Sequence, residues 1–195
     1  MAVIGTFPTS GNNDHQWRPS AYLWAARFAA GIALLAPPLA ASAKQAPPPA
    51  SLCQSTGHRQ LDFWVGKWDV FRPDSGTLVA HSMIEKLYNG CTIRETWMPI
   101  VGVPGGSLNT YRQKSAEWRQ VWTDAGNEIH DYRGRWNGSS MNFEGHASNA
   151  DEQLRRVRMT YAPTAEGDVI QTGYSWSDKD SKWNRDYQFV YRTAK

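Results

Sequence analysis

Short segments in which apolar and polar residues alternate, separated by turn residues, limit the fold of this chain more than any other feature. Alternation places successive side chains on opposite faces of a strand, and no stretch after position 53 has the 3.6-residue apolar period of a helix. Ten such segments, at nearly regular spacing, are typical of a sandwich or a barrel. The predicted strands are 63–72, 78–88, 92–98, 107–113, 117–123, 128–136, 140–147, 154–162, 168–177 and 183–192.

The connections between the predicted strands are short and rich in turn-forming residues. One of them, Asn137-Gly138, predicts a type I′ hairpin, in which both central residues have positive φ. Successive hairpins give an up-and-down meander, and closing the meander removes its two unpaired edges. We therefore predict an all-β fold, an up-and-down antiparallel β-barrel of about ten strands, with room inside for one small ligand.

The first 43 residues differ in composition from the rest of the chain. An apolar run at 28–36 follows Arg18 and Arg27, and it precedes the small-x-small triplet at 41–43. This order is typical of a secretory signal peptide, and the run is shorter than the roughly 20 residues of a membrane-spanning helix. A buried helix or a soluble, disordered N-terminus is the alternative. We predict a signal peptide at 1–43, a Pro-rich spacer and N-terminal arm at 44–57, and a barrel domain at 58–195 in a periplasmic or secreted protein.

The charge of the chain argues against nucleic acid as a partner. The formal net charge is +3 at pH 7, and removal of residues 1–43 would leave the balance near neutral. Basic residues gather only at 154–158, where they alternate with an apolar residue, as on a strand with a charged outer face. We therefore predict no nucleic-acid partner and no membrane association once the signal peptide is cleaved.

The two cysteines, Cys53 and Cys91, both lie beyond the predicted signal peptide. In an oxidising compartment, a pair of cysteines favours a disulfide, here one that would join the N-terminal arm to the barrel. Two free thiols are the alternative.

The first predicted strand carries Gly66-x-Trp68, which resembles the first-strand signature of lipocalins and other calycins. A larger ordered set of residues resembles one bacterial family of exported calycin-like proteins without an assigned function. The set comprises Asp62-Phe63-Trp64-x-Gly66-x-Trp68-Asp69-Val70, Asn89-Gly90-Cys91, Glu95-x-Trp97, Trp118-x-Gln120-Val121-Trp122-x-Asp124, Met141, Gly145, Ser177-Asp178, Trp183 and Tyr191-Arg192. The resemblance implies that Trp68 closes the base of the barrel and that Arg192 packs over its indole in a cation–π contact. It implies a fold and not a reaction.

Two predicted strands place a polar group beside large apolar groups on one face, which is the pattern of a ligand pocket. Glu95 alternates with Ile93 and Trp97, and Gln120 alternates with two tryptophans. We predict that six residues face the cavity and bind a small hydrophobic or amphipathic molecule: Glu95, Trp97, Gln120, Trp122, Arg158 and Tyr187. The alternative is that Glu95 and Arg158 form a structural ion pair while the aromatic residues fill the core.

Motifs for other chemistry are missing from the sequence after residue 53. Its histidines lack the spacings typical of a metal site, and there is no Gly-x-Ser-x-Gly elbow or phosphate-binding glycine loop. We therefore predict no metal and no cofactor, and we place His130 and His146 at the surface or at an edge; a single haem-ligating histidine is the alternative for either. The leading prediction is a binding barrel. One alternative is an isomerase or hydratase that uses Glu95 as acid and base near Gln120 and Tyr187. The other is a structural barrel filled by its own aromatics.

Overall fold

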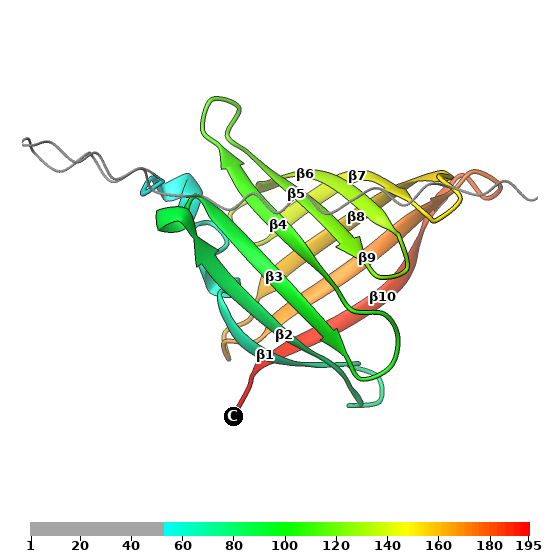
Figure 1. The fold of residues 1–195 in the computed structure, drawn as a ribbon, viewed down its shortest axis with the longest axis horizontal. Coiled ribbons are helices and arrows are strands. Elements are labelled where there is room, and N and C mark those ends of the chain that lie inside the picture. Colours follow the sequence, from blue (N-terminus) through cyan, green and yellow to red (C-terminus); the bar gives the residue numbers. More distant parts are fainter. Residues whose placement is uncertain (1–52) are drawn as a thin grey trace, which may run out of the picture. The chain divides into compact units, whose positions relative to one another are not determined.

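The computed structural model describes residues 53–195, so the signal peptide predicted at 1–43 and most of the predicted spacer lie outside the described residues. Ten antiparallel strands form one closed up-and-down barrel (Figure 1), as the alternation predicts. A calycin-like assignment is consistent with this architecture. The strands are β1 (Gly66–Phe71), β2 (Leu78–Leu87), β3 (Thr92–Pro99), β4 (Gly105–Arg112), β5 (Glu117–Asp124), β6 (Ile129–Trp136), β7 (Met141–Ser148), β8 (Leu154–Pro163), β9 (Val169–Ser177) and β10 (Lys182–Thr193).

The barrel closes because β1 pairs with β2 on one side and with β10 on the other. Most strand ends lie within two residues of the predicted ones, but β1 begins at Gly66 instead of residue 63. The preceding Asp62–Trp64 segment forms a 3-10 turn, η2. Gly66 has a φ of +152°, a conformation that favours glycine, and it lets the chain pass from η2 into the strand.

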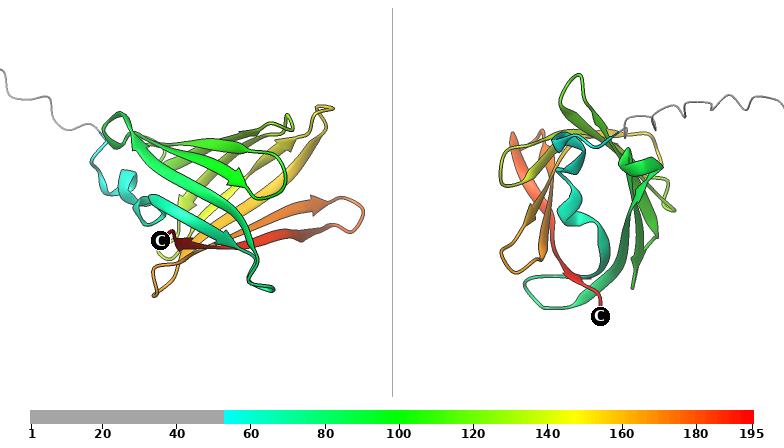
Figure 2. Two further views of the ribbon diagram at one scale, coloured as in Figure 1. Left: turned by 60° about the horizontal axis from the view of Figure 1, so that its bottom comes forward. Right: turned by 90° about the vertical axis from the view of Figure 1, so that its left-hand side faces the viewer.

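The N-terminal turns close one end of the barrel, which we call the base. In Figure 2 the segment with η1 (Thr56–Arg59) and η2 crosses the ring of strands in cyan. Leu61 and Trp64 are fully buried there, and the indole of Trp64 packs 4.5 Å from the ring of Tyr161, measured between centroids. Trp68 donates from its indole nitrogen to the carbonyl of Trp64 over 2.8 Å, so it lies at the base.

The predicted disulfide between Cys53 and Cys91 is confirmed. Cys91 directly follows a third 3-10 turn, η3 (Tyr88–Gly90), which connects β2 to β3. The bond therefore joins the N-terminal arm to the wall of the barrel beside the base.

The predicted stacking of Arg192 on Trp68 is wrong. Arg192 on β10 pairs in register with Asp69 on β1. Asp69 lies between the buried residues Trp68 and Val70, so strand alternation turns Asp69 and its partner Arg192 outward. Its guanidinium lies over the ring of Phe71, 5.2 Å from the centroid, and 3.4 Å from a carboxylate oxygen of Asp168. The neighbouring Tyr191 faces Trp68 instead, at 6.3 Å between ring centroids.

The predicted type I′ turn at Asn137-Gly138 is also wrong. The backbone N–H of Asn137 donates to the carbonyl of Ser140, so the two central residues are Gly138 and Ser139. Of these, Gly138 has a positive φ, as the first central residue of a type II′ turn requires. The side chain of Asn137 accepts from the backbone N–H groups of Ser139 and Ser140, and this holds the turn in place.

The end of the barrel opposite the base, which we call the mouth, is formed by the connections 72–77, 100–104, 125–128, 149–153 and 178–181. The base and the mouth differ because only the base is covered by the N-terminal turns. Any solute that enters the barrel without disturbing those turns therefore enters at the mouth.

Candidate functional site

A cavity of about 230 Å³, open to solvent, lies inside the barrel. Its walls are mainly aromatic, with several polar side chains between the rings. We call the following residues the aromatic wall: Trp97, Trp122, Tyr132, Tyr161, Tyr187, Phe189 and Tyr191. The volume lies below the roughly 300–1,000 Å³ of pockets for drug-sized ligands, so the cavity suits a molecule of few heavy atoms.

Five of the six predicted pocket residues line this cavity. Glu95 and Trp97 come from β3, Gln120 and Trp122 from β5, and Tyr187 from β10. Each pair on one strand is two residues apart, so strand alternation turns both members inward.

Arg158, the sixth predicted residue, lies outside the cavity on the outer face of β8. Its neighbours Val157 and Met159 are buried, and alternation therefore turns Arg158 outward. The guanidinium pairs with Glu144, with 3.1 Å between Nε and Oε2, and lies over the indole of Trp183, 4.1 Å from the ring centroid. The predicted alternative of an ion pair with Glu95 is excluded by the same contacts.

Glu95 is the most buried acid of the cavity, with 3% of its surface exposed. Its carboxyl accepts hydrogen bonds from Ser82 over 3.2 Å and from Ser107 over 3.1 Å. Burial raises the pKa of Glu95 to about 7, although the hydroxyls of Ser82, Ser107 and Tyr191 act in the opposite direction. The carboxyl therefore exchanges its proton near neutral pH, as acid–base and ligand-binding groups do.

The hydroxyl of Tyr191 lies between two acceptors. It is 3.4 Å from Oε1 of Glu95 and 2.8 Å from Oε1 of Gln171. A phenol has one proton, and the shorter contact favours Gln171 as its acceptor. When the phenol donates to Glu95 instead, it stabilises the carboxylate and opposes the effect of burial on the pKa of Glu95.

A second chain of hydrogen bonds reaches Glu95 along the neighbouring strands β4 and β5. Gln120 donates to Asn109 over 2.7 Å, and Asn109 donates to the hydroxyl of Ser107 over 3.0 Å. Because Ser107 in turn donates to Glu95, the amide of Gln120 and the carboxyl are linked through two buried side chains. Fully bonded buried polar networks hold their members in fixed positions.

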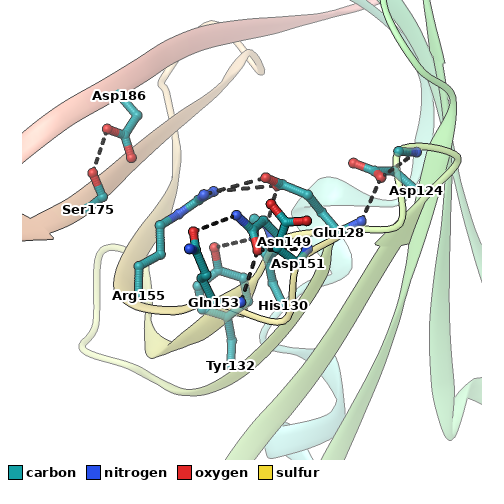
Figure 3. A network of polar contacts seen from close by, with 11 residues as sticks. Asp124, Glu128, His130, Tyr132, Asn149, Asp151, Gln153, Arg155, Ser175 and Asp186 are labelled. Atoms are coloured by element: carbon teal, nitrogen blue, oxygen red, sulfur yellow. Dashed lines mark hydrogen bonds and ion pairs between the residues drawn. The ribbon is translucent and has the colours of Figure 1, made fainter.

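Polar side chains also join across the mouth. Figure 3 shows Glu128 between His130 and Arg155, with 3.0 Å to the imidazole Nε2 and 3.4 Å to the guanidinium. Partial burial disfavours the charged form of Glu128, but the contacts with His130 and Arg155 outweigh it and lower the pKa of Glu128 below its usual value. An adjoining depression of about 460 Å³ shares part of this lining and adds Asp186, which accepts from Ser175 over 2.8 Å.

His130, predicted at the surface or at an edge, lies half-buried at the mouth, where its side chain lines the cavity. Both of its ring nitrogens have partners, since Nδ1 lies 3.1 Å from the hydroxyl of Tyr132 and Nε2 contacts Glu128. A haem iron would have to displace one of them. His146 lies exposed on β7, as predicted for a surface residue.

The sequence analysis missed several lining residues that alternation alone could have indicated. Met159 and Tyr161 are two residues apart on β8, and Phe189 and Tyr191 are two residues apart on β10. Gln171 had no such signal, because a lone polar residue in a strand does not show which face it occupies. The closed register shows it, since Gln171 pairs with Tyr161 on β8.

Within residues 53–195, no group of three or more His, Cys, Asp or Glu side chains could hold a metal ion. No helix in this part of the chain is long and apolar enough to span a membrane. No protein-family model matches the sequence, and no curated protein matches it. The function is therefore argued from the cavity.

Proposed function

We propose that this protein is an exported, calycin-like barrel that binds one small, partly apolar molecule in its cavity. The observation that carries the proposal is the cavity itself, about 230 Å³ in volume and walled by aromatic rings. A barrel filled by its own side chains would have no such space at the centre of the aromatic wall.

The arrangement of apolar and polar groups supports ligand binding. Trp97 lies at the centre of the aromatic wall, with ring centroids 6.5 Å from Trp122 and 5.8 Å from Phe189. Glu95 and Gln120 supply hydrogen-bonding groups beside these rings, and both are buried. Ligand sites combine an apolar lining with a few fixed polar groups of this kind.

The disulfide supports a periplasmic or secreted location. Structural disulfides persist in oxidising compartments and are rare in the cytosol. The bond between Cys53 and Cys91 thus agrees with the signal peptide proposed for residues 1–43.

Native mass spectrometry of the protein purified from a periplasmic extract tests this proposal. We expect a mature chain that begins at Lys44, two hydrogens lighter than the reduced form, with one small molecule retained per chain.

The substitution Gln120→Leu should weaken retention of this molecule, because it removes a polar group of the cavity. Arg119→Leu changes the adjacent residue, which pairs with Asp131 on the outer face, and should leave retention unchanged. Bare chains for all three proteins would overturn the proposal.

An enzyme in the same barrel is a second candidate, favoured by the pKa of Glu95 near 7. A carboxyl that gains and loses a proton at neutral pH suits an isomerase or hydratase. Incubating the retained molecule with the protein in deuterium oxide distinguishes the two candidates. Exchange of a carbon-bound hydrogen by the unaltered protein, and its loss in Glu95→Gln, would establish acid–base catalysis. Retention without exchange would leave binding as the function.

A further inference from the structure

On the premise that the protein is the binding barrel argued above, we propose that its ligand is a small organic cation of the alkylammonium type. Three features of the cavity carry this inference: the sign of its charges, the faces of its aromatic rings, and a buried carboxyl without a cationic partner. Each points to positive charge on the ligand.

The charged residues of the cavity are acidic. Glu95, Asp124 and Glu128 line it, and no described lysine or arginine does. The nearest cation is Arg155 at the mouth, and it already pairs with Glu128. An anionic ligand such as a fatty acid or a phosphate ester would therefore meet carboxylates without a basic partner, at a large cost in free energy.

The aromatic wall offers ring faces to a cation. Tyr187 and Phe189 stack with 4.9 Å between centroids, and Phe189 meets Trp97 at 5.8 Å. Trp122 meets Trp97 edge to face, at an angle of 71°. A cation within about 6 Å of a ring centroid is attracted by the ring quadrupole, most strongly by tryptophan. A cavity of this volume holds an ammonium head group and a few carbons.

Glu95 supplies the counter-ion. It lies two residues from Trp97 on β3, so its carboxyl and that indole share one face of the strand. Hydroxyl groups of Ser82 and Ser107 fix its orientation, yet within residues 53–195 no basic side chain pairs with it. Burial disfavours the charged form of this carboxyl, and a bound ammonium group beside it would offset part of that cost.

The mouth carries further acids on the path inward. One carboxylate oxygen of Asp124 accepts from the backbone N–H groups of Gly126 and Glu128, and no ion pair of the described residues includes Asp124. Asp186 accepts a hydrogen bond from the hydroxyl of Ser175, and it forms no ion pair among the described residues. The two arginines that line the same depression, Arg155 and Arg158, pair with Glu128 and Glu144, so the unpaired charges at the entrance are these two acids, which attract cations.

Isothermal titration calorimetry with two matched pairs of probes tests the inference. Choline is compared with its uncharged carbon isostere 3,3-dimethylbutan-1-ol, and butylammonium with butan-1-ol. We expect at least one cation to bind about tenfold more tightly than its neutral partner, the ratio that an added charge-assisted contact gives. In Glu95→Gln this preference should largely disappear, while the affinity for the neutral partner changes little. The control Glu144→Gln removes a carboxylate from the outer face of β7 and should keep the preference.

Other outcomes overturn the inference without overturning the proposed function. Equal or tighter binding of both neutral probes would show a cavity that selects apolar shape and not charge. Failure of both cations to bind, with a molecule retained in native mass spectrometry, would show a ligand of another class. A preference for a cation that survives Glu95→Gln would overturn the role of Glu95. Only bare chains together with four silent probes would remove the binding function too.

Discussion

Glu95 places a group that ionises near neutral pH in a buried position on the wall of the cavity. The unfolded chain loses this proton near pH 4.5, and the folded protein loses it near pH 7. Between these values the folded state holds more protons than the unfolded state, so the free energy of unfolding falls as the pH rises. The fall is about 1.4 kcal/mol per pH unit and at most about 3 kcal/mol in total.

We therefore predict that Glu95→Gln stabilises the protein at pH 8 and has little effect at pH 4. Glutamine keeps one oxygen that accepts from Ser82 or Ser107, and its NH2 group can donate to the other hydroxyl, but it carries no charge that burial could penalise. Urea unfolding of both proteins from pH 4 to 8 measures the difference between their free energies of unfolding. The other ionisable groups are the same in both proteins, so their contributions cancel from this difference. A variant that is equally destabilised at every pH would show that Glu95 acts through its hydrogen bonds alone.

Gly173 lies opposite Tyr187 in the pairing of β9 with β10, and a Cβ there would overlap the tyrosine ring. We predict that Gly173→Ala lowers the free energy of unfolding by about 1–3 kcal/mol, the range for overpacked sites, and displaces the ring within the cavity. Tyr187→Leu should then cost less in the Gly173→Ala background than in the unaltered protein, because a shorter side chain relieves the overlap. Urea unfolding of the four proteins gives the comparison, and additive costs would contradict it.

Alternation within one strand predicted the faces of Glu95, Trp97, Gln120 and Trp122. The same rule places Arg158 outside, between two buried apolar residues, so the predicted cavity position of Arg158 contradicts the alternation of its own strand. The contacts among Glu95, Tyr191 and Gln171 could not be predicted, because they join β3, β9 and β10. Such contacts depend on the closed register, which no single segment determines.

At the scale of the elements, turn-separated alternation was sufficient to predict ten strands and a barrel, since short hairpins leave little choice of topology. It was insufficient at η2, where Asp62–Trp64 has strand-like composition but forms a turn. There the burial of Leu61 and Trp64 at the base outweighs strand propensity. Tertiary packing, which a local pattern does not contain, therefore decides where β1 begins.

The N-terminal arm depends on its disulfide, since η1 and η2 are short turns with no strand pairing of their own. The bond between Cys53 and Cys91 spans 38 positions, and loop-closure entropy for that length corresponds to about 3–4 kcal/mol. We predict that the double substitution Cys53→Ser and Cys91→Ser lowers the free energy of unfolding by up to this amount.

Guanidinium unfolding of the disulfide variant, compared with the oxidised and reduced forms of the unaltered protein, measures this effect. The reduced protein should unfold at the same denaturant concentration as the double variant. An oxidised protein no more stable than the variant would mean that the arm is held by Leu61 and Trp64 alone.

At the scale of the whole molecule, the two ends of the barrel have different tasks. The base is filled by Trp64 and Trp68 and tied by the disulfide, so it offers no entry. The mouth leads to the cavity and presents Asp124 and Asp186, with Arg155 opposite Glu128. If the ligand is a cation, the entrance itself contributes to affinity, and its contribution must depend on salt.

We predict that neutralising the two mouth acids reduces the salt dependence of choline binding. Asn in place of Asp124 and Asp186 keeps the oxygen that accepts the existing hydrogen bonds, so only charge changes. At separations on the order of 10 Å in water, each charge contributes about 0.4 kcal/mol, together about fourfold in Kd at low salt. That attraction is largely screened at 0.15 M salt, where the Debye length is about 8 Å.

Titrations at 10 and 300 mM salt should therefore show a steeper loss of choline affinity for the unaltered protein and for the control Glu144→Gln. The loss should be shallower for the double variant Asp124→Asn with Asp186→Asn. Equal slopes for all three proteins would show that the mouth does not attract the ligand and that recognition is confined to Glu95 and the aromatic wall.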